Sequence, residues 1–341
     1  MTDYLRYADD LERIDPDEDA IAEKLIAVLS RGAEHSSRRE GHITRGSHVR
    51  VFAIARGELV VGEGLAPDLA QGLFAAPARY PVVARITHVP GENLPDDVVS
   101  VARSLSFRVE GAPGPYLPGA AVQDFTLDSG SPRFTVPDAR SFLAAITAAV
   151  AAGVLPDALK TVVSAGASVV RRAAEAVGVD APIADFLGHP KLNPLSETYY
   201  SQAPMRWGDG VAKLRIRPVE RPNRPIEIDG AEAIGEAVLA ELRERGAEWA
   251  VEAQLAIDEE VTPIENARAL WPEEQTPYRE VGRLRLPAQD ATPDEADDAA
   301  LAFSPTNALA AHRPLGSIMR ARMKVYPVMA AKRGARVKEQ A

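Results

Sequence analysis

The sequence predicts an α+β fold whose main feature is an antiparallel, eight-stranded β-barrel with inserted helices and a helical C-terminal segment. Segments rich in β-branched residues alternate apolar and polar positions, as half-buried strands do. Turns rich in Gly, Pro and Asp separate these segments. Helical segments do not follow the strands in regular alternation, which disfavours a doubly wound parallel sheet.

We expect one domain over residues 1–341, made of a helical arm (1–35), a barrel (36–290) and a C-terminal helical segment (291–341). The arm follows from apolar residues at helical spacing within residues 3–31. The strand patterns are 49–61, divided in two by a turn at Arg56-Gly57, and 80–89, 104–111, 122–127, 197–208, 211–219, 248–258 and 280–286. Helices are expected over 138–152 and 156–177, in an insertion at about 138–190, and over 231–245. Asp209-Gly210 is expected to form a hairpin turn.

Composition excludes several classes of function. A net charge of -10 disfavours nucleic acid as a partner. The absence of cysteine excludes thiolate catalysis and iron–sulfur clusters. No apolar run approaches the roughly 20 residues of a membrane helix, so integral membrane association is not expected. The acidic N-terminus lacks the apolar core of a signal peptide, which makes the cytoplasm the expected location.

Common catalytic motifs are missing from the sequence. Six histidines are present, but none forms HExxH or another close metal-binding pair. Gly-x-Ser-x-Gly is absent, which disfavours a hydrolase. There is no glycine-rich phosphate-binding loop.

Two pairs of residues could carry chemistry. Arg322 and Tyr326 stand four apart in a helical segment, so their side chains share one face. A guanidinium beside a phenol stabilises the phenolate, and tyrosine is a known ligand of heme iron. Arg39 and His42 stand three apart before the first strand, where a neutral imidazole could act as a general acid–base.

The order of these and other motifs resembles the heme catalase superfamily, specifically its short catalase-related branch, over residues 36–330. The resembling segments are Arg39-x-x-His42 with Phe52, Arg85-x-Thr87, RSLSFRV from Arg103, QDFTLDSGSPRF (123–134), LWPEEQTPYREVGRLRL (270–286), AFSP (302–305) and Arg322-x-x-x-Tyr326. The resemblance implies heme b as cofactor, with Tyr326 as the axial ligand of the iron.

The same resemblance implies a role for each matching residue. Arg322 would keep Tyr326 anionic. His42 would be the distal acid–base, and Thr87 would hydrogen-bond its imidazole from behind. The remaining implied cofactor contacts are Arg39 and Arg85 to the heme propionates and Phe134 beside the distal pocket.

The chain departs from the catalase pattern on the distal side. Ser129 stands where catalases have an Asn that orients peroxide, Thr135 replaces a second pocket Phe, and Gly41 precedes His42. A looser, more polar pocket should weaken disproportionation of hydrogen peroxide and admit other reductants. We therefore expect a heme peroxidase that uses hydrogen peroxide or organic hydroperoxides with small organic reductants and keeps residual catalase activity.

Two alternatives remain open: an enzyme of allene oxide synthase type that converts fatty-acid hydroperoxides, and a heme-binding protein without catalysis. The arm that interlocks catalase subunits is short here, so a homodimer or a monomer is expected.

Overall fold

The computed structural model describes residues 4–41, 43–97, 99–153, 167, 168, 170, 188–220 and 224–340. The barrel strands are β1 (Val51–Val61), β2 (Ala78–His88), β3 (Arg103–Val109), β4 (Gln123–Ser129), β5 (Tyr199–Tyr200), β7 (Gly210–Pro218), β8 (Ala247–Leu255) and β9 (Arg279–Leu286), and β6 (Met205–Trp207) forms a hairpin with β7. The helices are α1 (Glu18–Glu40), α2 (Ala139–Gly153), α5 (Ala233–Glu244), α6 (Glu295–Ala300) and α7 (Ser317–Gln340). Short 3-10 turns lie at Gly72–Phe74, Pro194–Ser196 and Ala310–His312.

The eight barrel strands form a closed antiparallel sheet. They are hydrogen-bonded in the order β5-β4-β3-β2-β1-β9-β8-β7, and β5 also pairs with β7 through Tyr199 and Ile216. Closure leaves the sheet without the exposed edges that favour aggregation. The predicted α+β fold with an eight-stranded antiparallel barrel is therefore confirmed.

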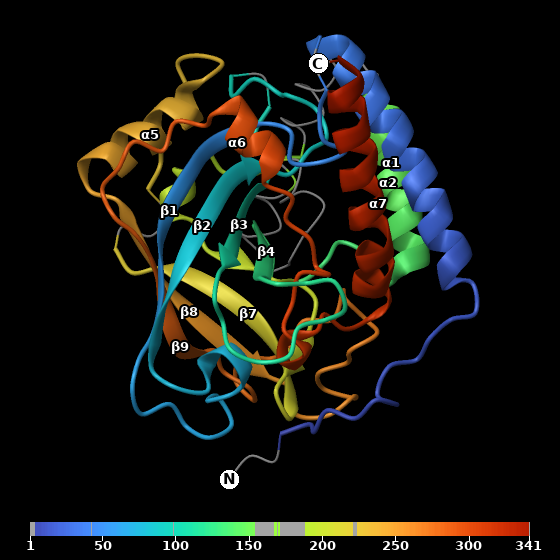
Figure 1. The fold of residues 1–341 in the computed structure, drawn as a ribbon, viewed down its shortest axis with the longest axis vertical. Coiled ribbons are helices and arrows are strands. Elements are labelled where there is room, and N and C mark those ends of the chain that lie inside the picture. Colours follow the sequence, from blue (N-terminus) through green and yellow to red (C-terminus); the bar gives the residue numbers. More distant parts are fainter. Residues whose placement is uncertain are drawn as a thin grey trace.

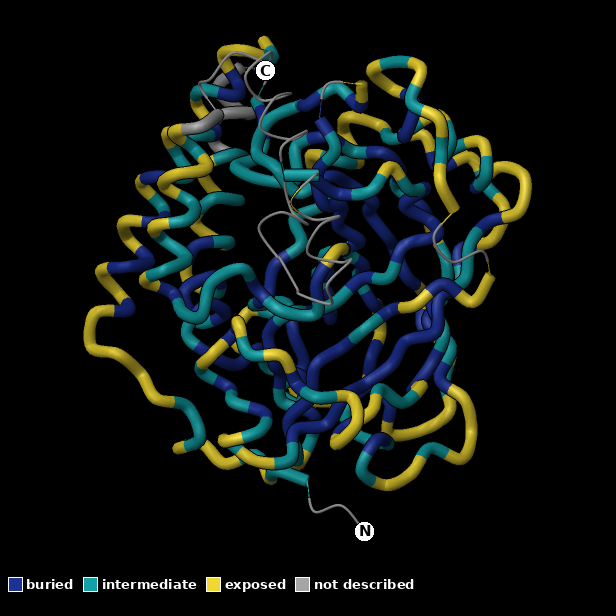
Figure 2. The backbone as a smooth tube through the Cα atoms, turned by 180° about the vertical axis from the view of Figure 1, so that it is seen from behind, coloured by how far each residue is buried: buried dark blue, intermediate teal, exposed yellow. Residues whose placement is uncertain are grey.

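The barrel interior holds the main hydrophobic core. Because side chains alternate across each strand, every second residue points inward. Leu59, Phe107, Trp207, Leu214 and Trp249 each expose 1% of their surface or less. Figure 2 shows buried backbone concentrated in the strands and exposed backbone in the outer loops and helices.

Helices α1, α2 and α7 lie together along one side of the barrel (Figure 1). A second apolar cluster joins them, with Leu25 of α1, Ala139 of α2, and Ala321 and Val325 of α7. This packing fixes the orientation of α7 about its own axis. It therefore decides which of the residues of α7 face the barrel.

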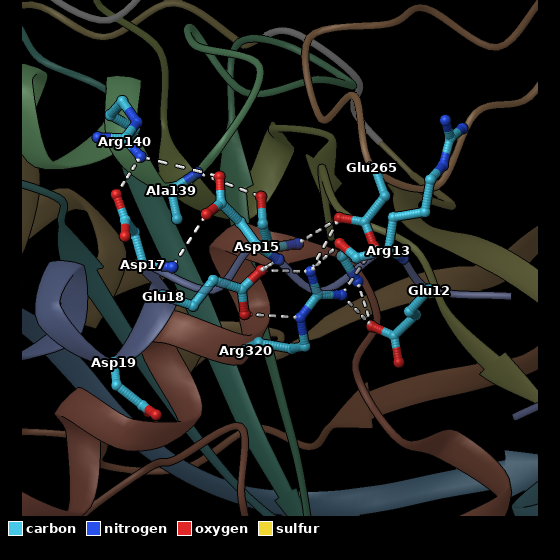
Figure 3. Close-up of polar contacts among 12 residues, drawn as sticks. Glu12, Arg13, Asp15, Asp17, Glu18, Asp19, Ala139, Arg140, Glu265 and Arg320 are labelled. Carbon is cyan, nitrogen blue, oxygen red and sulfur yellow. Dashed lines mark hydrogen bonds and ion pairs between the residues drawn. The ribbon is translucent and has the colours of Figure 1, made fainter. Parts of the chain in front are cut away.

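The N-terminal segment binds α7 through charged groups (Figure 3). Arg320 donates to Glu12 (2.6 Å), Glu18 (2.6 Å) and Glu265 (2.8 Å). The side chains of Glu12 and Glu18 are only 5% and 4% exposed, so Arg320 is the counter-ion that makes their burial tolerable.

Three local predictions differ from the structure. The helix expected over 3–31 begins at Glu18, shortly after Pro16, whose ring cannot continue a helix in the N-terminal direction. The turn expected at Arg56-Gly57 does not exist, because β1 is continuous. A Cβ at Gly57 would lie 2.0 Å from the carbonyl oxygen of Arg285, so the glycine serves close pairing with β9.

The strand expected over 197–208 is divided into β5 and β6. Gln202 has a φ of 59° and precedes Ala203-Pro204, which interrupts an extended backbone. The hairpin at Asp209-Gly210 is present, since Trp207 pairs with Gly210. Most of the helix expected over 156–177 lies outside the described residues.

Candidate functional site

A cavity lies between α7, the loop before β1 and the adjoining faces of β2, β3 and β4. It is lined by Leu29, Ser30, Ala33, Glu34, Thr44, Arg45, Gly46, Ser47, His48, Arg85, Ser106, Thr126, Ala302, Phe303, Val325, Tyr326, Met329, Ala330, Lys332 and Arg333. Its volume is about 160 Å³, below the roughly 300–1,000 Å³ of most ligand sites.

Tyr326 lies on the α7 wall of this cavity, and Arg322 contacts it from one helical turn earlier. Arg322 Nη2 donates to the Tyr326 oxygen at 2.8 Å, as expected for residues one helical turn apart. Burial alone would lower the pKa of Arg322, but Tyr326 and Asp128 raise it above its ordinary value. The phenol oxygen thus lies beside a permanent positive charge.

His48 lines the same cavity from the loop before β1. Burial and the guanidiniums of Arg85, Arg322 and Arg45 lower the pKa of His48 to about 3. The imidazole is therefore neutral at ordinary pH and can accept a proton. Its Nδ1 lies 3.4 Å from Thr87 Oγ1.

The backbone of His48 is held in an uncommon conformation. Its φ is 54°, in the left-handed region that residues other than glycine adopt rarely. Its N–H donates to the Val89 carbonyl at 3.0 Å, and its carbonyl accepts from Arg85 Nη2 at 2.9 Å. Contacts to β2 and the residue after it therefore compensate the strain and fix the imidazole in place.

Three arginines meet at one side of the cavity. Arg85 Nε and Arg45 Nη2 lie 2.6 and 3.3 Å from Asp298 Oδ1, and Arg333 Nη2 donates to the Ala299 carbonyl at 3.1 Å. Burial and the neighbouring Arg85 lower the pKa of Arg45 to about 9, although Asp298 opposes this shift. Arg45 Nε is buried without a hydrogen-bond partner. The three guanidiniums have only this one ion-pair partner among the described residues, so the charge favours an anionic ligand.

Four of the sequence-predicted site residues lie in or directly beside the cavity. Arg85 and Tyr326 line it, Thr87 lies 3.4 Å from the lining His48, and Arg322 contacts Tyr326. Arg85 and Thr87 are neighbours on one face of β2, and Arg322 and Tyr326 are one turn apart on α7. His42 lies outside the described residues.

Thr87 was expected to contact the imidazole of His42, and this stays a prediction because His42 is not described. Among the described residues, Thr87 Oγ1 lies 3.4 Å from Nδ1 of His48. The sequence carried a signal for this, because Arg45-x-x-His48 repeats the spacing of Arg39-x-x-His42 and lies closer to β1.

Arg39, expected at a propionate, lies away from the cavity lining. Arg39 is in the last turn of α1, and its guanidinium is 3.5 Å from the carboxylate of Glu92. Phe134, expected beside the distal pocket, packs edge-on against Phe142 with ring centres 6.1 Å apart, in a cluster with Ile318 and Met319. A loop separates Arg39 from β1 and Phe134 from β4. Across a loop, spacing in the sequence does not fix where a side chain points.

Ser129 was expected in the distal pocket but points to the opposite face of β4. Its Oγ accepts from the Arg103 N–H at 3.0 Å and lies 3.3 Å from His189 Nε2, within a buried polar cluster. The pleat places Thr126 and Asp128 on the cavity side instead. Burial raises the pKa of Asp128, opposed by Arg322 and Ser104.

Other kinds of site are not found in the described part of the chain. No group of three or more His, Asp or Glu side chains there could bind a metal ion. None of the described helices is both long and apolar enough to cross a membrane.

Comparison with known proteins gives the fold a name. No family model and no curated protein matches the sequence. Among solved structures, a fungal catalase is similar with a TM-score of 0.62 and 16% identity, over 85% of this chain and 59% of its own length. Catalase A from Saccharomyces cerevisiae has a TM-score of 0.60 and 15% identity, over 97% and 67%. A bacterial catalase has a TM-score of 0.61 and 16% identity, over 96% and 63%.

The chain thus spans about three fifths to two thirds of the length of these catalases. The similarity extends over 85% to 97% of this chain. The chain has the catalase fold.

Proposed function

We propose that this protein is a heme-dependent peroxidase that uses hydrogen peroxide or organic hydroperoxides and small organic reductants. The observation that carries the proposal is the 2.8 Å contact between Arg322 and Tyr326 in a cavity that also contains the neutral His48 and an excess of arginine charge. The catalase fold supports it as an analogy of architecture.

The donor set of the cavity fits a heme in its chemistry. Tyr326 would hold the iron through its phenol oxygen, and Arg322 would donate a hydrogen bond to that oxygen. Arg45, Arg85 and Arg333 supply positive charge for two propionates, where fork-shaped guanidiniums bind carboxylates well. The unpartnered Nε of Arg45 is a donor without another acceptor. A bound heme would supply iron that binds peroxide and accepts the electrons of the reductant.

The residues of β2 and of the loop before β1 would handle protons in this proposal. His48 would accept a proton from one peroxide oxygen and return it to the other. Thr87 contacts Nδ1 and so orients the ring with Nε2 available to the substrate.

Heme titration of the purified protein tests the proposal directly. We expect a Soret band typical of ferric tyrosinate, which Tyr326→Phe changes or abolishes. Tyr278→Phe is the matched control, since Tyr278 stacks on Arg215, 3.9 Å from ring centre to guanidinium, outside the cavity lining. Protein that takes up no heme, or an unchanged spectrum in Tyr326→Phe, would refute it.

Turnover of the heme-loaded protein then separates the substrates. Hydrogen peroxide, cumene hydroperoxide and a fatty-acid hydroperoxide should each be tested with and without a phenolic reductant. Reductant-dependent turnover supports a peroxidase. Rearrangement of the fatty-acid hydroperoxide without reductant, or oxygen release at the rate of a large catalase, would contradict it.

A further inference from the structure

Helix α6 lies next to three arginines that line the cavity and is attached to them by charge. All three arginines bind the segment 298–301: Arg85 and Arg45 through Asp298, Arg45 also through the Leu301 carbonyl at 2.7 Å, and Arg333 through the Ala299 carbonyl. The last carbonyls of a helix carry partial negative charge, which adds to that of Asp298. The C-terminal turn of α6 therefore places negative charge beside the guanidiniums, as the carboxylates of an acidic ligand would.

Little else holds α6 in place. None of its residues is buried. In Figure 1 it lies beside the upper ends of β1 and β2, outside the barrel. The chain on each side is fixed to the barrel, since the Ile54 N–H donates to Ala291 and Arg108 Nη2 donates to the Ala302 carbonyl. The polar contacts to the arginines are thus the main attachment of α6.

We propose that α6 is a lid that an acidic ligand displaces. In the free protein Asp298 binds Arg85 and Arg45, and the carboxylates of the ligand take its place when the ligand binds. The inference rests on the proposed heme site, because it takes the heme propionates as the displacing groups. The incoming carboxylates would restore the ion pairs with Arg85 and Arg45 that displacement of Asp298 breaks.

Hydrogen exchange provides the first test. We expect the amides of residues 295–301 to exchange faster in Asp298→Asn than in the wild type, both without heme. Asp297→Asn is the matched control: it removes the same charge from the same helix, and Asp297 is exposed and has no ion pair among the described residues. Heme should also accelerate exchange in the wild-type α6, whereas ligands usually protect the segments they touch.

Heme affinity provides the second test. Wild-type protein must break the Asp298 contacts to bind, whereas Asp298→Asn does not, so its Kd should be lower by about tenfold, the size of one charge-assisted contact. Asp297→Asn should bind like the wild type.

The outcomes separate this inference from the proposed function. If the wild type binds no heme, the proposed function fails, and the exchange of α6 in heme-free Asp298→Asn still decides whether Asp298 holds it closed. If heme binds but protects α6, or if Asp298→Asn weakens binding, Asp298 orients the arginines for the ligand and the lid is refuted.

Discussion

Replacing His48 by alanine separates proton transfer from heme binding. The side chain lines the cavity, but the heme would be held by residues of α7 and the arginines, so the His48→Ala variant should still bind heme with an unchanged Soret band. Since the pKa of His48 is lowered to about 3, nearly every molecule carries the basic form at pH 7. His48 is thus available as a base at this pH, and its loss should cost about 10²–10⁴-fold in the rate with peroxide.

That loss corresponds to about 3–5 kcal/mol in the activation free energy. The assay is rapid mixing of heme-loaded protein with hydrogen peroxide, followed at the Soret band. Thr87→Val removes the contact to Nδ1 but leaves the imidazole, so the rate should fall by about tenfold, the lower end for a residue that orients another. His35→Ala is the control, since His35 of α1 is outside the cavity lining.

The same assay decides between two histidines. If His42→Ala causes the large loss and His48→Ala changes the rate less than threefold, the acid–base role belongs to His42 and the reasoning from the cavity is wrong. The wild-type rate should stay constant between pH 8 and about 4, because His48 protonates only near pH 3. Control of the rate by a group that titrates near pH 6.5 would also contradict the assignment.

Three further predictions concern stability, measured by urea unfolding. Arg320→Gln leaves buried carboxylates without their counter-ion and should lower the free energy of unfolding by about 3 kcal/mol, whereas the exposed Arg13→Gln should change it little; equal effects would refute a role for this cluster. Gly57→Ala should cost about 2–3 kcal/mol because of the 2.0 Å approach to β9, whereas Gly62→Ala, with nothing within 4 Å, should be near neutral. A buried neutral histidine binds fewer protons below pH 6.5 than the same histidine does in the unfolded chain. The free energy of unfolding should therefore be steady above pH 6.5 and should fall below it, by about 1.4 kcal/mol per pH unit for each such group. Burial lowers the pKa of His312 to about 4, so His312→Gln should make the decline between pH 6.5 and 4 less steep; an unchanged slope would contradict this.

Local patterns in the sequence were sufficient for part of the site. Arg322 and Tyr326 are four residues apart in a helix, so their contact follows from helix geometry alone. Arg85 and Thr87 are two apart in a strand, so they share a face by the pleat. In both cases the relevant distance is set within one element, which sequence spacing fixes.

Other parts required long-range packing. Two Arg-x-x-His segments precede β1, and only the fold shows that His48 reaches Thr87, 39 residues away. Ser129 and Asp128 are adjacent in sequence, and the register of β4 with β3 decides that Asp128 faces the cavity. A shift of one residue exchanges the two faces of a strand, which motif matching cannot detect.

The sequence by itself determined the strand pattern, the barrel class and the pair Arg322–Tyr326, because each depends on periodicity within a short segment. Only the tertiary structure decided which histidine shares the cavity with Tyr326, which arginines meet there, and that Asp298 binds Arg85 from 213 residues away. The physical reason is that cavity charge is a sum over groups brought together by barrel closure and helix packing, and no local pattern encodes that sum.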